Sequence, residues 1–249
     1  MLLTLAGLVL SGVAAPTVVV ADGLVIGEYG NGRWLDGQKL MVPTTATVTY
    51  RAVGLGTIGA SATIKGFFTE DPPGGPLLGM PNDEREVPAR LLVSGSRLKV
   101  PRKVRRLGTG SKTYVEALTS FLSSQKYKAK ARLTNVISAD LDGNGTQEIL
   151  IEGSSRPRVH QGETKPGDYS VVLLRAIVGG RVRTIPIQFS KRGTEHWVNS
   201  HELLGVADFD GDGALEFVVT NDYYEGQEAT VYRFVKGKLV ALASNGAGV

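Results

Sequence analysis

Residues 136–151 read VISADLDGNGTQEILI, and residues 204–219 read LGVADFDGDGALEFVV. Aligned on their first aspartates, Asp140 and Asp208, the two stretches are 68 residues apart. Each consists of an apolar run, an acidic turn that contains glycine, and a second apolar run. This pattern is typical of two strands joined by a tight turn. Because the pattern occurs twice, the sequence predicts two copies of one supersecondary unit.

Both turns carry oxygen-bearing side chains at positions 1, 3, 5 and 9, with glycine at positions 4 and 6. Calcium takes six to eight oxygen ligands in flexible geometry, and alternate residues of a tight loop can direct their oxygens to one centre. Glycine lets the backbone fold closely around an ion. The backbone carbonyl of position 7 supplies a further ligand. We therefore predict two Ca²⁺ sites, formed by Asp140, Asp142, Asn144, Thr146 and Glu148, and by Asp208, Asp210, Asp212, Ala214 and Glu216.

The spacing excludes the EF-hand, which needs a bidentate glutamate at position 12 between two helices. Here position 12 is Ile151 or Val219, each inside an apolar run. The loops instead resemble the calcium hairpin of integrin-type FG-GAP and VCBS repeats, whose pattern is Asp-x-Asp-x-Asp-Gly-x-x-Asp. Glutamate stands at the ninth position in both copies. Such repeats usually build propeller blades, and relatives of this kind are small exported bacterial proteins, so the resemblance implies secretion and calcium but no activity.

An alternative is a pair of polar turns held by side-chain hydrogen bonds without an ion. That reading accounts for aspartate and glycine, but it leaves several carboxylates repelling one another in each turn. The second loop has four carboxylates and the first has three, because Asn144 is neutral. Charge alone therefore predicts tighter Ca²⁺ binding at residues 208–216. In either loop the expected role of the ion is structural rather than catalytic.

The flanking sequence predicts a mainly β protein with short antiparallel sheets, two four-stranded blade-like calcium-loop units and one packing helix. High glycine content, at 32 residues, and short apolar runs favour many short strands. We expect an N-terminal β segment over residues 22–100, a basic connector over 101–112, and the helix with both repeats over 113–249. A capping box of Thr113 and Glu116 predicts the start of the helix, and Leu118, Phe121 and Leu122 predict its buried face.

The uncharged, leucine-rich residues 1–21 resemble a secretory signal peptide, with small-residue cut sites after Ala15 or Ala21. An uncleaved membrane anchor and an ordinary buried first strand are the alternatives. The expected location is therefore secreted, periplasmic or at the cell surface. The absence of cysteine excludes disulfides, thiolate metal sites and thiol catalysis.

The net charge of +4 is unevenly distributed, since residues 97–132 hold eleven Lys or Arg and one acid. The basic stretch Arg97–Arg106 is a possible surface for an anionic partner. It lacks interleaved aromatics and any nucleic-acid motif, so no nucleic acid is expected as a partner. A solvated basic linker is the alternative.

Two functions remain open from sequence. The first is a calcium-stabilised structural or binding module whose ligand is a protein or glycan, with Tyr223 and Tyr224 as candidate contacts. The second is a secreted hydrolase with structural calcium, in which acids of residues 222–225, or Glu195 and Glu202, do the chemistry. No His-Glu-x-x-His and no Gly-x-Ser-x-Gly motif occurs. His160, His196 and His201 are interpreted as loop or surface residues, and the first function is favoured.

Overall fold

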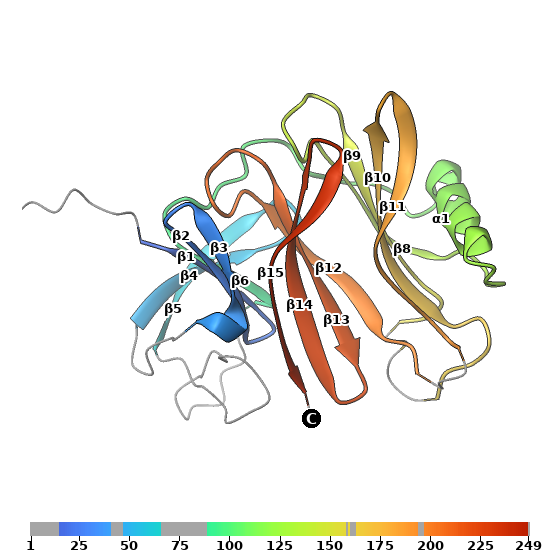
Figure 1. Ribbon diagram of the computed structural model, residues 1–249, viewed down its shortest axis with the longest axis horizontal. Helices are drawn as coiled ribbons and strands as arrows, with labels where there is room; N and C mark the ends of the chain where they lie inside the picture. The colour runs from blue at the N-terminus through green and yellow to red at the C-terminus, as the bar shows by residue number, and fades with distance from the viewer. Residues whose placement is uncertain are drawn as a thin grey trace, which may run out of the picture.

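The computed structural model describes residues 15–40, 47–65, 89–157, 159, 163–193 and 197–248. These residues form three antiparallel sheets and one α-helix (Figure 1). The prediction of a mainly β fold with a single helix is therefore confirmed.

The N-terminal sheet has the order β3-β2-β1-β6-β4-β5. Its strands are β1 (Thr17–Ala21), β2 (Leu24–Gly30), β3 (Arg33–Asp36), β4 (Thr47–Val53), β5 (Ile58–Lys65) and β6 (Leu91–Ser94), and a 3₁₀ turn, η1 (Gly37–Lys39), follows β3. The five-stranded sheet has the order β11-β10-β9-β8-β7, with β7 (Arg105–Arg106), β8 (Leu133–Ala139), β9 (Glu148–Ser154), β10 (Tyr169–Val178) and β11 (Arg181–Lys191). The C-terminal sheet runs β12-β13-β14-β15, with β12 (Ser200–Ala207), β13 (Glu216–Tyr223), β14 (Gly226–Val235) and β15 (Lys238–Gly248).

Two-residue turns at positive φ connect several hairpins. Asn31 and Gly32 have φ of 52° and 76°, and Lys236 and Gly237 have φ of 51° and 75°. Positive φ at both central residues matches the right-handed twist of the flanking strands, which explains why these turns close tight hairpins. Along the chain, strand, acidic loop, strand, connection, strand, glycine turn and strand follow one another from β8 to β11 and again from β12 to β15.

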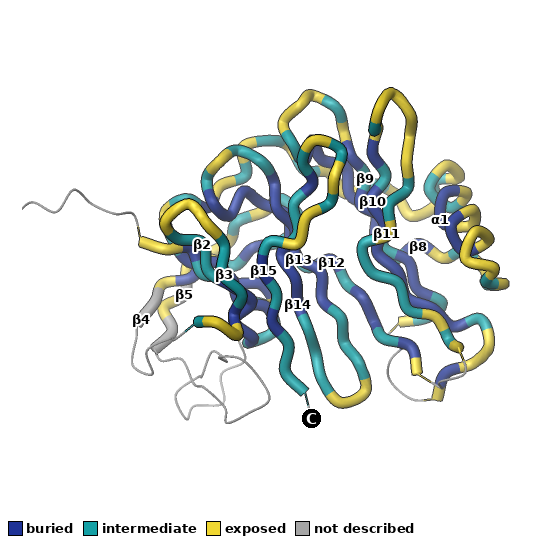
Figure 2. The backbone as a smooth tube through the Cα atoms, viewed as in Figure 1, coloured by how far each residue is buried: buried dark blue, intermediate teal, exposed yellow. Residues whose placement is uncertain are grey.

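The C-terminal sheet lies between the other two sheets (Figure 1). On one side it packs on the five-stranded sheet through a core that includes Leu150, Val172 and Phe217. On the other side it packs on the N-terminal sheet through residues such as Ile26, Leu91 and Val231. Figure 2 shows buried backbone running through the centre of all three sheets, with exposed residues at the loops. The acidic loops therefore project from strands that are fixed by packing on both faces.

The helix α1 (Lys112–Ser124) covers the outer face of the five-stranded sheet. Leu118, Phe121 and Leu122 are buried there, as the sequence predicts. The predicted capping box is wrong, because Ser111 is the N-cap residue and Thr113 already lies inside the helix. Ser111 makes no side-chain cap hydrogen bond, so the start of this helix does not depend on a capping side chain.

The basic connector is not a free linker. Its residues Arg105 and Arg106 form β7, which pairs with Ser138 and Ile137 at the open edge of β8. The first repeat unit is therefore part of a five-stranded sheet rather than a four-stranded one. The unpaired backbone groups of β8 explain the addition, because an exposed strand edge accepts any extended segment held beside it.

At the N-terminus, β1 lies in the interior of its sheet, paired with β2 on one side and β6 on the other. Of the two cut sites considered, only the one after Ala15 leaves this strand in the protein. Residues 1–14 of the candidate leader lie outside the described residues. Among the residues that are described, no helix has the length and apolar character needed to cross a membrane.

Candidate metal centre

The two acidic loops connect β8 to β9 and β12 to β13, and they touch each other. The backbone N–H of Leu215 in the second loop donates to the carbonyl oxygen of Leu141 in the first, at 2.7 Å. Positions 4 and 6 of both loops have positive φ, between 77° and 96°, at Gly143, Gly145, Gly211 and Gly213. A left-handed backbone at these positions is why the pattern requires glycine there.

In the first loop, Asp140, Asp142 and Glu148 each place a carboxylate oxygen within 4.8 Å of the others. Asp140 and Glu148 are buried, with exposed fractions of 6% and 1%. Hydrogen bonds fix both side chains: Asp140 Oδ2 accepts from the N–H of Gly145 at 3.1 Å, and Glu148 Oε2 accepts from the N–H of Leu141 at 2.8 Å. The carboxylates are thus held together by the backbone of their own loop.

Asp140 Oδ1 is the exception in this cluster. It is buried and has no hydrogen-bond partner among the described residues. A buried carboxylate oxygen without a partner loses its hydration and gains nothing in exchange, at a free-energy penalty of about 1–3 kcal/mol or more. A cation bound at this cluster would remove that penalty.

The electrostatics of Glu148 indicate the same deficiency of positive charge. The pKa of Glu148 is raised to about 7, chiefly by burial; the negative charges of Asp142 and Asp140 contribute to the rise, and the hydrogen bond from Leu141 opposes it. A carboxylate with a raised pKa beside two other carboxylates is typical of a site that lacks its counter-ion.

In the second loop, Asp208, Asp210 and Glu216 form the matching cluster, again within 4.8 Å of one another and all buried. Asp208 accepts the N–H of Gly211 at 2.6 Å on Oδ1 and the N–H of Gly213 at 2.8 Å on Oδ2. Both of its oxygens are therefore satisfied, in contrast to Asp140. Burial also raises the pKa of Asp208 and of Glu216, with Arg233 opposing the rise at Glu216.

Arg233 on β14 extends its guanidinium into this second cluster. Its Nε donates to Glu216 Oε1 at 2.7 Å, and its Nη1 lies 2.9 Å from Asp212 Oδ2. Its Nη2 donates to Asp210 Oδ2, which also accepts from Trp34 Nε1 at 3.2 Å. Three of the four carboxylates in the second loop therefore already contact one internal cation.

Both clusters have the donors and the spacing to hold a metal ion, but they differ in how their oxygens are occupied. The first cluster has carboxylate donors and an unsatisfied buried oxygen. In the second, oxygens of Asp210, Asp212 and Glu216 are occupied by Arg233. The expectation of tighter Ca²⁺ binding in the second loop is based on its four carboxylates and does not take the positive charge of Arg233 into account.

Side chains of the basic stretch Arg97–Arg106 reach both loops, which the sequence did not indicate. Arg102 Nε donates to the carbonyl oxygen of Asp140 at 2.7 Å and lies 3.6 Å from Asp140 Oδ2. Lys99 Nζ lies 3.5 Å from Asp208 Oδ2 and donates to the carbonyl of Gly211 at 3.2 Å. Part of the positive charge of Arg97–Arg106 therefore compensates the acidic loops. Arg102, Lys103 and Arg105 also line a cavity beside the first loop, so an anionic partner there stays a prediction.

Other predicted ligands are less enclosed. Asn144 is exposed, and its Oδ1 accepts from the N–H of Thr146 at 2.7 Å. Asp212 is exposed as well, and its Oδ1 accepts from the N–H of Ala214 at 2.8 Å. These hydrogen bonds from backbone to side chain are typical of polar turns. They are therefore compatible both with turns that bind no ion and with turns that bind a metal ion.

Among the acids considered for hydrolysis, Glu202 contacts Arg90, Asp222 lies in β13, and Glu225 lies in the turn between β13 and β14. Glu195 lies outside the described residues, as do His160 and His196. His201 is buried rather than exposed, so the expectation of a loop or surface position is wrong for this residue. It lies on β12, where its backbone N–H donates to Ser170 Oγ at 2.9 Å.

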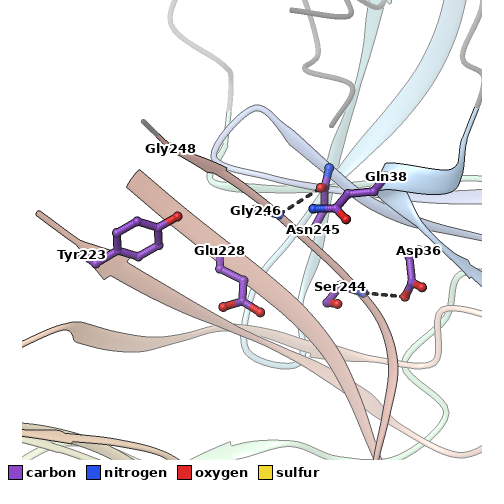
Figure 3. Close-up of a pocket in the computed structure, with 8 residues that line it drawn as sticks. All are labelled: Asp36, Gln38, Tyr223, Glu228, Ser244, Asn245, Gly246 and Gly248. Carbon is purple, nitrogen blue, oxygen red and sulfur yellow. Dashed lines mark hydrogen bonds between the residues drawn. The ribbon is translucent and has the colours of Figure 1, made fainter. Parts of the chain in front are cut away.

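A polar pocket between β13–β15 and the β3–η1 segment contains two carboxylates, Asp36 and Glu228 (Figure 3). Asp36 is bonded to Lys39 at 2.5 Å and accepts from the N–H of Ser244 at 3.2 Å. The bond from Lys39 lowers the pKa of Asp36. An ionised aspartate is no proton donor at neutral pH, so this pocket supplies no acid for hydrolysis from Asp36.

No family model, no curated protein and no solved structure matches this chain. The candidate function therefore depends on the sequence and the structure of this chain.

Proposed function

We propose that the protein is an exported β-sheet module stabilised by calcium, and that it serves as a structural or binding unit outside the cytoplasm. The observation that carries the proposal is the first loop, where Asp140, Asp142 and Glu148 converge and Asp140 Oδ1 is buried with no hydrogen-bond partner in the described part of the chain. Its donors are all oxygens, which suit a hard cation such as Ca²⁺ rather than zinc or copper.

The ion would neutralise carboxylates that are buried at the junction of β8 and β9. An ion that binds only the folded state stabilises it by about 2.7 kcal/mol when its free concentration is 100 times the dissociation constant. Calcium would thereby stabilise the first loop. It would also stabilise the second loop through the hydrogen bond from the N–H of Leu215 to the carbonyl oxygen of Leu141. The role is structural, and the binding surface would lie elsewhere on the sheets.

One exposed feature supports a binding role. Trp197 and Tyr224 form an aromatic pair with ring centroids 4.4 Å apart, and they are 47% and 65% exposed. Exposed aromatic rings with polar edges are well suited to contact sugar rings or peptide side chains. The proposed partner is therefore a glycan or a protein. Loss of binding in both Trp197→Ala and Tyr224→Ala, measured against a panel of immobilised glycans and surface proteins, would support this surface.

Export is proposed from the apolar leader, and the mass of the mature protein tests it. Cleavage after Ala15 leaves β1 intact, whereas cleavage after Ala21 removes a strand that pairs on both sides. A mature chain that begins at Pro16 would fit the proposal. A full-length chain that stays inside the cell would contradict it.

The calcium proposal is tested by calorimetric titration of the full chain with CaCl₂, together with thermal melting with and without chelator. Asp142→Asn removes one charge but keeps an oxygen that can accept the N–H of Asn144. Glu116→Gln, on the exposed side of α1, is the matched control for the charge change. We expect saturable heat and a chelator-sensitive melting temperature in wild type and control, both reduced in Asp142→Asn. Absence of heat and of any melting shift in the wild type would refute the proposal.

A further inference from the structure

The strand that lies beside each acidic loop carries a different residue opposite the glutamate of that loop. In the C-terminal sheet, Arg233 of β14 pairs directly with Glu216 of β13. In the five-stranded sheet, Arg175 of β10 pairs with Ile149 of β9, and the antiparallel register therefore places Ala176 opposite Glu148. The position that holds an arginine in one unit holds an alanine in the other.

The difference changes how the carboxylates are neutralised. A guanidinium offers five N–H donors in a planar fork and remains charged at any physiological pH. Arg233 uses this fork on Glu216, Asp210 and Asp212, and its side chain is only 16% exposed. Together with the N–H donors on Asp208, it leaves the second cluster satisfied by groups of the protein itself.

Among the residues that the structure describes, no cation occupies the centre of the first cluster in this way. Arg102 contacts Asp140 from the connector side, and Asp140 Oδ1 remains without a partner. With every carboxylate counted as ionised and the nearest cations included, each loop has a formal charge of −2: three carboxylates and Arg102 in the first, four carboxylates with Arg233 and Lys99 in the second. The formal charge is therefore the same in both loops. The loops differ in whether a carboxylate oxygen remains available to bind a metal ion.

We propose that Arg233 takes the place of a metal ion in the second loop, so that the chain binds one divalent cation, at the first loop, and holds the second loop together by itself. A metal entering the second cluster would have to displace a largely buried guanidinium that lies within hydrogen-bond distance of three carboxylates. Removal of the arginine turns the second loop into a second metal site. The assignment of the single site to the first loop rests on the proposed function, while the role of Arg233 does not.

The test combines stoichiometry with a reporter placed by the structure. Calorimetric titration with CaCl₂ counts bound equivalents in the wild type and in Arg233→Met, which keeps an unbranched stem of similar length. Arg175→Met, on the corresponding strand of the other sheet, is the matched control. Trp34 donates to Asp210, so terbium luminescence excited through tryptophan reports occupancy of the second loop, and Trp34→Phe shows how much of the signal comes from this residue.

We expect one equivalent in the wild type and in Arg175→Met, and two in Arg233→Met, with terbium luminescence that appears only in Arg233→Met and is lost with Trp34→Phe. If Arg233→Met is too unstable alone, a rise in its melting temperature on adding CaCl₂ that exceeds the rise in the wild type supports the proposal, because the ion then restores the lost charge.

The outcomes separate this inference from the calcium proposal. Two equivalents in the wild type, one of them lost in Asp212→Asn, would overturn the role of Arg233 but leave the first site standing. No equivalent in the wild type and one in Arg233→Met would support the role of Arg233 and refute metal binding in the first loop. No gain in Arg233→Met would overturn the inference.

Discussion

Arg102 stabilises the first loop through hydrogen bonds, but its charge should repel a cation bound there. Replacing Arg102 by methionine should therefore change stability and metal affinity in opposite directions. Arg102 donates to the carbonyl oxygens of Asp140 and Leu141, at 2.7 and 3.3 Å, and its side chain is 24% exposed. Hydrogen bonds from a charged donor contribute about 1.5–3 kcal/mol each. In Arg102→Met, water can replace part of these hydrogen bonds to the two carbonyl oxygens. The substitution should therefore reduce the free energy of unfolding of the metal-free protein by about 1–3 kcal/mol.

Calcium affinity should rise in the same variant. Calcium lies about 2.3–2.6 Å from its oxygen ligands. Asp140 Oδ2 lies 3.6 Å from Arg102 Nε, and Oδ1 belongs to the same carboxylate, so an ion on Oδ1 would lie within about 8 Å of the guanidinium nitrogen. At the dielectric constant of water, a double and a single positive charge at that distance repel by about 1 kcal/mol, and a lower local dielectric constant increases the value. Loss of the arginine should therefore strengthen binding by about fivefold or more.

The assay is calorimetric titration with CaCl₂ in parallel with denaturant unfolding of the metal-free protein. Lys103→Met is the control, because it removes the same charge from the next residue, which is exposed and lines the same cavity. A much smaller change in affinity is expected there. Unchanged or weaker calcium binding in Arg102→Met, or an equal gain in both variants, would refute this account of the first loop.

Two further changes test the fold. Burial lowers the pKa of His201 to about 4, so stability should fall as pH drops from about 6.5 toward 4, by up to about 3 kcal/mol, because only the unfolded state takes up the proton over that range. Denaturant unfolding of His201→Leu should lose this pH dependence, and a pH profile identical to wild type would show that another group is responsible. Leu118→Ala on α1 should reduce the free energy of unfolding by about 2–5 kcal/mol, since Leu118 is fully buried against the five-stranded sheet. A loss below about 1 kcal/mol in chemical denaturation would mean that the helix contributes little to that core.

The repeated unit could be predicted from sequence because its information is local. Turn residues such as Lys236-Gly237 and the alternation of apolar residues determine each hairpin within a few residues. The glycines of the acidic loops signal a left-handed backbone in the same way. Positions 1, 3 and 9 of each loop converge as predicted, because a tight turn between paired strands brings them to one side.

The cations of the site could not be predicted because they depend on contacts between distant segments. Arg233 reaches Glu216 from the neighbouring strand, 17 residues later, and only the strand register shows that the two are opposite. Arg102 and Lys99 reach their loops across 38 and 112 residues. The sequence does contain one relevant signal. When β10 and β14, the third strands of the two units, are aligned on the glycine turns that follow them, Arg233 corresponds to the uncharged Ala176.

Diffraction from a crystal of the full chain grown with CaCl₂ tests the central claim most directly, through the anomalous signal of the ion. We expect one peak at the first loop, about 2.3–2.6 Å from Asp140 Oδ1, with Asp142 and Glu148 among the other ligands of the ion. Arg233 should still contact Asp210 and Glu216 in the same crystal. A first loop without a peak, with Asp140 Oδ1 bonded to water, would contradict the claim.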